Sequence, residues 1–147
     1  MDDIEIQIGR IFERYRSAVH ARDIEAFIAL YSRDVRVFDT WGIWSYEDAS
    51  AWRNAVSQWF TSIAKEAEET VTVNANDIRI AGVTDLASAS AIVTYAAISA
   101  TGRTLRRMQN RLTWTLARQG GNWLIVHEHT SMPVTPDDMH ALTAIST

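Results

Sequence analysis

Apolar residues recur every three or four positions through the first third of the chain, a spacing typical of amphipathic helices. This spacing predicts a first helix over residues 4–19 and a short second helix over residues 24–31. Ser45 and Asp48 resemble a capping box that would open a third helix, whose apolar face covers residues 52–63. The N-terminal part of the chain is therefore expected to be helical, with one interruption.

The interruption and the second half of the chain follow a strand pattern instead. The run Val35–Phe38 is β-branched and aromatic, so it predicts a short strand that ends at Asp39. After residue 69 apolar and polar residues alternate, and glycines mark the turns between the alternating runs. Four further strands are predicted, over residues 71–80, 86–99, 104–117 and 123–130.

Three helices followed by a run of strands indicate an α+β fold. We expect a cone, in which the three N-terminal helices pack on the concave face of a strongly curved antiparallel sheet. The open, apolar end of such a cone is a natural site for a small molecule. Residues 1–147 are expected to form one domain, with a core over 1–132 and a C-terminal tail over 133–147. A helix-start signal at Thr135 predicts one helical turn in that tail.

The register of the last hairpin decides which side chains face the interior of the cone. If Gly120–Gly121 is a two-residue loop, Thr113 lies opposite Glu128 and shares its face. A three-residue loop over residues 119–121 shifts the pairing by one and moves Trp114 to the face of Glu128. Both alternatives remain open at this point.

Composition narrows the class of protein. The chain carries 14 basic and 18 acidic side chains, and its net charge of −4 argues against nucleic-acid binding. Without a signal peptide or an apolar run long enough to span a membrane, we expect a cytoplasmic protein with no membrane partner. The absence of cysteine excludes disulfides and cysteine-based metal sites. His127 and His129 lie two apart, but nothing near them completes a metal site, so no metal or other cofactor is expected.

Three stretches of the chain form a recognisable pattern. The first is the predicted N-terminal helix with Tyr15, followed by residues 23–26; the second covers residues 30–39, and the third covers residues 121–131. Together they resemble the nuclear transport factor 2-like (NTF2-like) superfamily, in particular its ketosteroid isomerase and SnoaL-like branches. The resemblance implies the cone of the cystatin-like fold. It leaves the function open, because the superfamily hosts isomerases, dehydratases, cyclases, hydrolases and binding proteins.

The resemblance also implies roles for individual residues. Tyr15 matches a tyrosine that donates a hydrogen bond to an enolate oxygen, and Asp39 matches an aspartate that moves the proton. Tyr31 matches a further tyrosine that lines the same pocket. The second oxyanion donor of that branch is a protonated carboxylic acid, and its best match here is Thr113, with Asn110 three residues earlier. The chain therefore departs from the isomerase pattern at this position.

The tryptophans divide into two kinds. Trp52 and Trp59 lie on one face of the third predicted helix, where they are expected to pack the helix against the sheet. Trp41 and Trp44 lie in a loop after Asp39, where packing alone rarely requires two tryptophans. We interpret Trp41 and Trp44 as a wall or lid over the mouth of the cone.

Glu128 lies between apolar neighbours near the end of the last predicted strand. On a concave face a lone carboxylate is costly unless it is paired, for instance with Arg111. Glu128 is therefore a candidate acid–base partner of Asp39 or a ligand anchor, and a solvated carboxylate is the alternative.

Together these residues predict a protein that binds a small hydrophobic organic molecule. As an enzyme it would be a cofactor-independent isomerase, cyclase or dehydratase that transfers a proton on a cyclic substrate. Asp39 would be the base and Tyr15 the main donor, which requires both side chains to converge on one open cavity. The alternative is a non-catalytic ligand-binding or dimerisation domain with a vestigial pocket, and hydrolysis of an epoxide or similar ring is a third. The ligand-binding residues are expected to be Tyr31, Trp41, Trp44, Trp59, Thr113, Trp114, Glu128 and Thr130.

The resemblance finally implies a homodimer formed through the outer face of the sheet. Trp123, Ile125, His127 and His129 alternate with Glu128 along the last predicted strand. Side chains two apart on a strand share a face, so all four are expected on the outer face, opposite Glu128.

Overall fold

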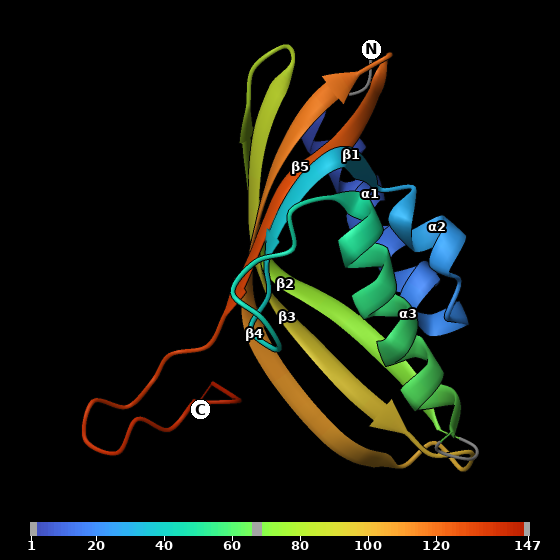
Figure 1. Ribbon diagram of the computed structural model, residues 1–147, viewed down its shortest axis with the longest axis vertical. Helices are drawn as coiled ribbons and strands as arrows, with labels where there is room; N and C mark the ends of the chain where they lie inside the picture. The colour runs from blue at the N-terminus through green and yellow to red at the C-terminus, as the bar shows by residue number, and fades with distance from the viewer. Residues whose placement is uncertain (1–2, 66–68, 146–147) are drawn as a thin grey trace.

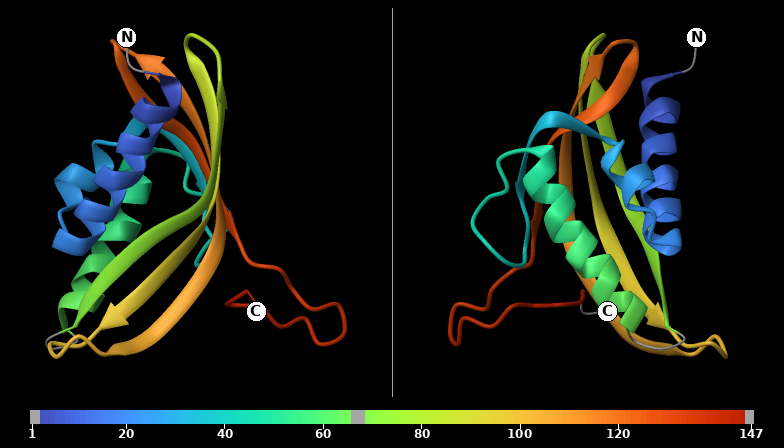
Figure 2. Two further views of the ribbon diagram at one scale, coloured as in Figure 1. Left: turned by 180° about the vertical axis from the view of Figure 1, so that it is seen from behind. Right: turned by 45° about the vertical axis from the view of Figure 1, so that its right-hand side comes forward.

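The computed structural model describes residues 3–65 and 69–145, and it confirms the expected α+β class (Figure 1). The helices lie on the concave side of a curved sheet, and two further views show the same arrangement (Figure 2). None of the helices in the described ranges combines the length and hydrophobicity that crossing a bilayer requires. In chain order the elements are α1 (Ile4–Ala21), α2 (Ile24–Ile28), β1 (Tyr31–Phe38), α3 (Ala49–Lys65), β2 (Thr70–Gly82), β3 (Leu86–Ile98), β4 (Thr104–Gln119) and β5 (Asn122–Ser131).

The start of each later helix depends on an aspartate cap. Asp23 caps α2, since its carboxylate accepts a hydrogen bond from the backbone N–H of Ala26 at 3.1 Å. Asp48 accepts the equivalent bond from Ala51 at 2.8 Å at the start of α3. Ser45 lies too early to take part and binds Glu47 instead, at 2.6 Å. The predicted capping box is therefore wrong, and Asp48 itself is the cap.

The five strands form one sheet in the order β1-β5-β4-β3-β2. Strands β2 to β5 pair in antiparallel fashion as expected, but β1 pairs with β5 in parallel. The chain leaves β1 through a loop and α3 and enters the sheet again at the opposite edge, so β1 runs in the direction of β5. The sheet is therefore mixed rather than wholly antiparallel, which corrects the expected antiparallel sheet.

A β-bulge in the last hairpin combines the two registers that the sequence left open. The loop has two residues, Gly120–Gly121, because Gln119 pairs with Asn122. Val126 is then the extra residue of a bulge, after which Trp114 pairs with Glu128. The structure therefore has the short loop, but it places Trp114 and not Thr113 beside Glu128.

The bulge also changes which side chains of β5 face the helices. Before it Trp123 and Ile125 are buried in the core, and after it Glu128 and Thr130 take the inward positions. The expectation that Trp123 and Ile125 lie on the outer face is therefore wrong, because one inserted residue shifts the alternation by one. His129, by contrast, is exposed.

Aromatic stacking between helix and sheet fills the end of the cone that α1 crosses. The Phe12 ring lies 4.3 Å from the Trp114 ring, centroid to centroid, and Trp114 is fully buried. Burying an indole removes roughly 200 Å² from water, which stabilises the fold by about 5 kcal/mol as an upper estimate. The Trp123 indole N–H donates to Gln7 Oε1 at 2.8 Å, which joins β5 to α1.

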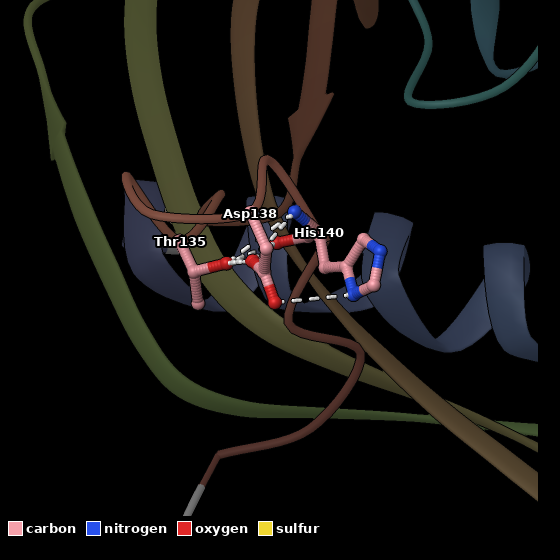
Figure 3. A network of polar contacts seen from close by, with 3 residues as sticks. All are labelled: Thr135, Asp138 and His140. Atoms are coloured by element: carbon pink, nitrogen blue, oxygen red, sulfur yellow. Dashed lines mark hydrogen bonds and ion pairs between the residues drawn. The ribbon is translucent and has the colours of Figure 1, made fainter.

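The C-terminal tail leaves the sheet on the side opposite the helices (Figures 1 and 2). Its one compact feature is a turn in which Asp138 accepts hydrogen bonds from the Thr135 hydroxyl and the His140 backbone (Figure 3). The His140 ring lies 3.3 Å from the same carboxylate. Met139 has a φ of 59°, in the left-handed region, which ends any helical course. The predicted helical turn at Thr135 is therefore a closed turn instead.

Candidate functional site

A cavity of about 1070 Å³ opens between α3, the inner face of β3 to β5 and the loop that follows β1. Its walls are largely apolar and aromatic, and its polar groups come from the sheet and its strand ends, from α1 and α3, and from the C-terminal tail. The apolar lining includes Phe27, Tyr46, Trp52, Val56, Trp59, Ile63 and Val71. The polar lining includes Tyr15, Asp39, Tyr95, Asn110, Glu128 and Thr130.

Asp39 follows the last residue of β1 and lines this cavity. One carboxylate oxygen accepts a hydrogen bond from the Thr130 hydroxyl at 2.9 Å, and the other accepts one from the Trp41 backbone N–H at 3.3 Å. Burial raises the pKa of Asp39, and the hydrogen bond from Thr130 opposes that rise. Each oxygen keeps a lone pair for a ligand, since a carboxylate accepts about four hydrogen bonds.

Tyr15 of α1 and Tyr95 of β3 meet at the cavity through their hydroxyl groups, which lie 2.9 Å apart. Burial raises the pKa of both phenols, so both keep their protons at neutral pH. One proton holds the pair together, which leaves the other hydroxyl able to donate a hydrogen bond to a ligand.

Glu128 is only 1% exposed, yet it lines the same cavity. The Tyr31 hydroxyl and the Trp114 indole N–H both donate to its Oε1, at 2.7 and 2.8 Å. Among the described residues no hydrogen bond reaches Oε2. Burial raises the pKa of Glu128 to about 7, against the effect of the two donors. The carboxyl group therefore keeps its proton to a higher pH than an ordinary glutamate does.

Six of the residues singled out in the sequence line the cavity together. They comprise both candidate catalytic residues and four of the candidate ligand-binding residues. These six are Tyr15, Asp39, Trp41, Trp59, Glu128 and Thr130.

The other four candidates lie elsewhere. Tyr31 and Trp114 lie behind the cavity wall and hold Glu128. Thr113 is exposed on the outer face of the sheet, paired with His129, because it alternates with the inward Trp114. Trp44 is 97% exposed and does not line the cavity, so only Trp41 of the loop pair contributes to its wall.

Of the cavity residues that were not assigned to it from the sequence, Tyr95, Asn110 and Trp52 bear most on its chemistry. Tyr95 is the one aromatic residue among the small and β-branched residues of β3. Asn110 lies an even number of residues before Leu112 and Trp114 in β4, so all three side chains share one face of the strand. Once that face is known to point inward, Asn110 is expected inside the cone. Trp52, expected to be core, is buried but also lines the cavity.

Among the described residues no group of three or more histidine, cysteine, aspartate or glutamate side chains is placed to hold a metal ion. The polar groups that line the cavity are carboxyl, hydroxyl, amide and guanidinium groups in an aromatic surround.

Solved structures of other proteins share the fold of this chain. A structure of an NTF2-like protein of unknown function from Pseudomonas putida is 24% identical, with a TM-score of 0.82 over 97% of this chain and 96% of the other. An NTF2-like protein with a cystatin-like fold from Novosphingobium aromaticivorans is 16% identical, with a TM-score of 0.71 over 94% and 93%. The protein Aln2 from a Streptomyces species is 13% identical, with a TM-score of 0.74 over 89% and 93%.

No curated protein matches the chain. The structural likenesses confirm the NTF2-like, cystatin-like fold that the sequence resemblance implied. The family model of the SnoaL-like domain matches residues 8–135, which is most of the chain. This protein belongs to the SnoaL-like domain family.

Proposed function

We propose that the cavity binds a small cyclic organic molecule and that the protein moves a proton on it without a cofactor. One observation carries the proposal: Asp39, Glu128 and the Tyr15–Tyr95 hydroxyl pair all line a single, otherwise largely apolar cavity. A ligand in an apolar cavity is held mainly by shape, and a few polar groups orient it. Carboxyl and phenol groups are the groups that general acid–base chemistry needs.

In this proposal Asp39 is the base. Its raised pKa brings it nearer to neutral pH, where a base is most effective, and the Thr130 hydroxyl holds it in place. On a cyclic ketone with a β,γ carbon–carbon double bond, it removes a proton from the carbon between the carbonyl and that double bond, and returns the proton to the far carbon of the double bond. The double bond thereby moves next to the carbonyl, so the substrate isomerises and no electrons are gained or lost.

The Tyr15–Tyr95 pair stabilises the negative charge that develops on the carbonyl oxygen. A hydroxyl that already accepts a hydrogen bond donates more strongly through its own proton, so the pair is a better donor than one tyrosine alone. Tyr95 thereby takes the supporting position for which Thr113, on the outer face, is unsuited. Glu128, with a free Oε2, anchors the ligand.

The alternative function is binding without catalysis. Both Asp39 oxygens and the Tyr15 hydroxyl already have partners within the protein, which favours a site that holds a ligand without acting on it. The two functions differ in whether the proton of a bound ketone exchanges with solvent.

Deuterium exchange separates the two functions. The protein is mixed in D₂O with a panel of cyclic ketones, and NMR follows loss of the proton next to the carbonyl. We expect faster exchange with at least one ketone, and a loss of about 10²- to 10⁴-fold in Asp39→Asn. Thr113→Val, a matched change on the outer face, should exchange at the parent rate. Ketones that bind without faster exchange would overturn catalysis and leave the binding function.

We also propose that two copies of the chain associate through the outer face of the sheet. On that face the Phe38 ring lies 5.1 Å from the His127 ring and 5.5 Å from the His129 ring. The Arg36 guanidinium lies 4.5 Å from the Phe38 centroid. Light scattering that finds a monomer at micromolar concentration would contradict this association.

A further inference from the structure

Two carboxyl groups of the cavity, those of Asp39 and Glu128, are here called the acidic pair; Glu128 is fully buried, and Asp39 is half-buried. Within residues 3–65 and 69–145 neither carboxyl forms an ion pair with a lysine, arginine or histidine. Asp39 lies near enough to contribute to the raised pKa of Glu128. Buried carboxylates in proteins are normally paired with a cation, so the acidic pair is incomplete as it stands.

Glu128 shows where the missing partner belongs. Oε1 accepts two hydrogen bonds from behind the wall, from Tyr31 and Trp114, whereas Oε2 accepts none from the described residues. The residue is buried from bulk solvent, with an exposed fraction of 1%, and it still lines the cavity. An oxygen left in this state in an otherwise satisfied carboxylate is an open acceptor for a group that enters the cavity.

The walls around the acidic pair suit a cation as well. Tyr15, Tyr95 and Trp59 line the cavity, and the Trp59 and Tyr95 rings lie 6.0 Å apart at 73°. The faces of tyrosine and tryptophan rings attract ammonium groups through their quadrupole. Carboxylates combined with aromatic rings are thus complementary to a positively charged nitrogen.

We infer that the cavity binds a cyclic or flat organic ligand that carries a protonated amine, and that the amine pairs with Oε2 of Glu128, beside Asp39. This inference rests on the proposed use of the same cavity for small molecules. It adds the chemical class of the ligand, since a hydroxyl group would leave the acidic pair without a counter-charge.

Two arginines, Arg106 and Arg107, also line the cavity, but they do not remove the expected preference for a positively charged ligand. Arg106 is bound to Glu69 through two contacts of 3.3 and 2.5 Å, and Arg107 is an exposed residue. Both come from the part of β4 that extends beyond the end of β5. Among the described residues, the titratable and charged groups of the cavity are Tyr15 from α1, Asp39 and Tyr46 after β1, Glu69 before β2, Tyr95 from β3, Arg106 and Arg107 from β4, and Glu128 from β5.

A series of probes on one bicyclic frame tests the charge preference. The probes are 2-aminotetralin, 2-tetralol and tetralin-2-carboxylate, which are cationic, neutral and anionic at pH 7. Calorimetry is expected to find the amine bound at least about tenfold more tightly than the alcohol, and the carboxylate most weakly. In Glu128→Gln, which keeps an acceptor for Tyr31 and Trp114, the preference for the amine should fall to about threefold or less. Thr113→Val on the outer face should keep the parent's preference.

Proton release on binding provides a second measurement, because Glu128 would release no proton to an amine if its role were only to hold the fold together. Burial raises the pKa of Glu128 to about 7, so an amine that holds this group ionised should displace part of a proton per ligand at pH 7. Titrations in two buffers with different enthalpies of ionisation measure that number. The alcohol should release none, and neither ligand should release a proton from Glu128→Gln.

Equal affinity for the amine and the alcohol, tighter binding of the carboxylate, or no proton release with the amine would overturn the inference. If Glu128→Gln does not fold, the three probes and the proton count on the parent protein decide by themselves. Exchange of ketone protons in D₂O is a separate readout. The proposed catalysis therefore survives if ketones exchange while the amine is not preferred, and fails if amines are preferred while no ketone exchanges.

Discussion

Buried polar atoms have hydrogen-bond partners at the closed end of the cone, which α1 crosses, but some of them lack good partners in the cavity at the other end. At the closed end the indole N–H groups of Trp114 and Trp123 both have acceptors, at 2.8 Å each. In the cavity wall the amide oxygen of Asn110 is buried without a partner among the described residues, and the indole N–H of Trp52 has only a weak interaction with the Tyr31 hydroxyl. A core polar atom usually has a partner, because leaving it unpaired costs about 1–3 kcal/mol.

Glu128 lies on the boundary between these two regions. Its Oε1 belongs to the satisfied closed end, since Tyr31 and Trp114 donate to it, whereas its Oε2 belongs to the cavity. One side chain of β5 therefore serves both regions: Oε1 of Glu128 stabilises the fold, and Oε2 of the same carboxylate is left for a ligand. The following predictions test this division.

The largest expected effect comes from removing the acceptor at the boundary. Glu128→Leu leaves the Tyr31 hydroxyl and the Trp114 N–H without their partner, so the free energy of unfolding should fall by roughly 2–5 kcal/mol. Glu128→Gln keeps an amide oxygen in the same place and should lose much less. Urea unfolding measures both. Equal losses in the two variants would show that the donors do not depend on this acceptor.

The second largest effect is expected in the pH dependence of stability, since the free energy of unfolding should change as Glu128 titrates. Its pKa rises from the ordinary 4.5 to about 7 in the folded protein, so the folded state binds the proton more tightly. The resulting stability is fully present below pH 4.5 and is lost as the pH rises through 7, by about 3 kcal/mol in total. Urea unfolding between pH 4.5 and 8 measures it, and the slope should flatten in Glu128→Gln. A parent slope that the variant retains would assign the effect to another group.

A matched pair of tryptophan variants compares the two regions directly. Trp114→Phe removes an N–H that donates to Glu128 at 2.8 Å, whereas Trp52→Phe removes an N–H that has only a weak interaction with the Tyr31 hydroxyl. Both lose similar ring area, so Trp114→Phe should cost about 1–2 kcal/mol more than Trp52→Phe. Thermal or urea unfolding of the two variants gives the difference. A Trp52→Phe variant that is the less stable of the two would contradict the division between closed end and cavity.

The order and type of the helices and strands followed from local pattern. The apolar spacing of α1 and the alternation in β2 to β5 are local properties of the chain, and packing in the fold agrees with them. Asp39 and Tyr15 could be singled out because they match the superfamily pattern without a gap. The structure places both of them on one cavity.

The errors came from features that depend on contacts between distant residues. The parallel pairing of β1 with β5 joins residues about 90 positions apart, which no local pattern encodes. The exposed positions of Trp44 and Thr113 follow from a loop course and a strand phase that only the assembled sheet determines. Tyr95 belongs to the site because the fold brings β3 and α1 to the same cavity, where the Tyr95 hydroxyl contacts the Tyr15 hydroxyl.

By itself the sequence determined the α+β class, the succession of helices and strands, and the family resemblance, because hydrophobic periodicity and turn residues act over a few positions. Tertiary structure decided the bulge at Val126, and with it the inward positions of Glu128 and Thr130. A single extra residue reverses the faces of a strand, and its place is chosen by pairing with β4 and β1 rather than by the residue itself. The composition of the cavity was therefore settled only when the sheet was assembled.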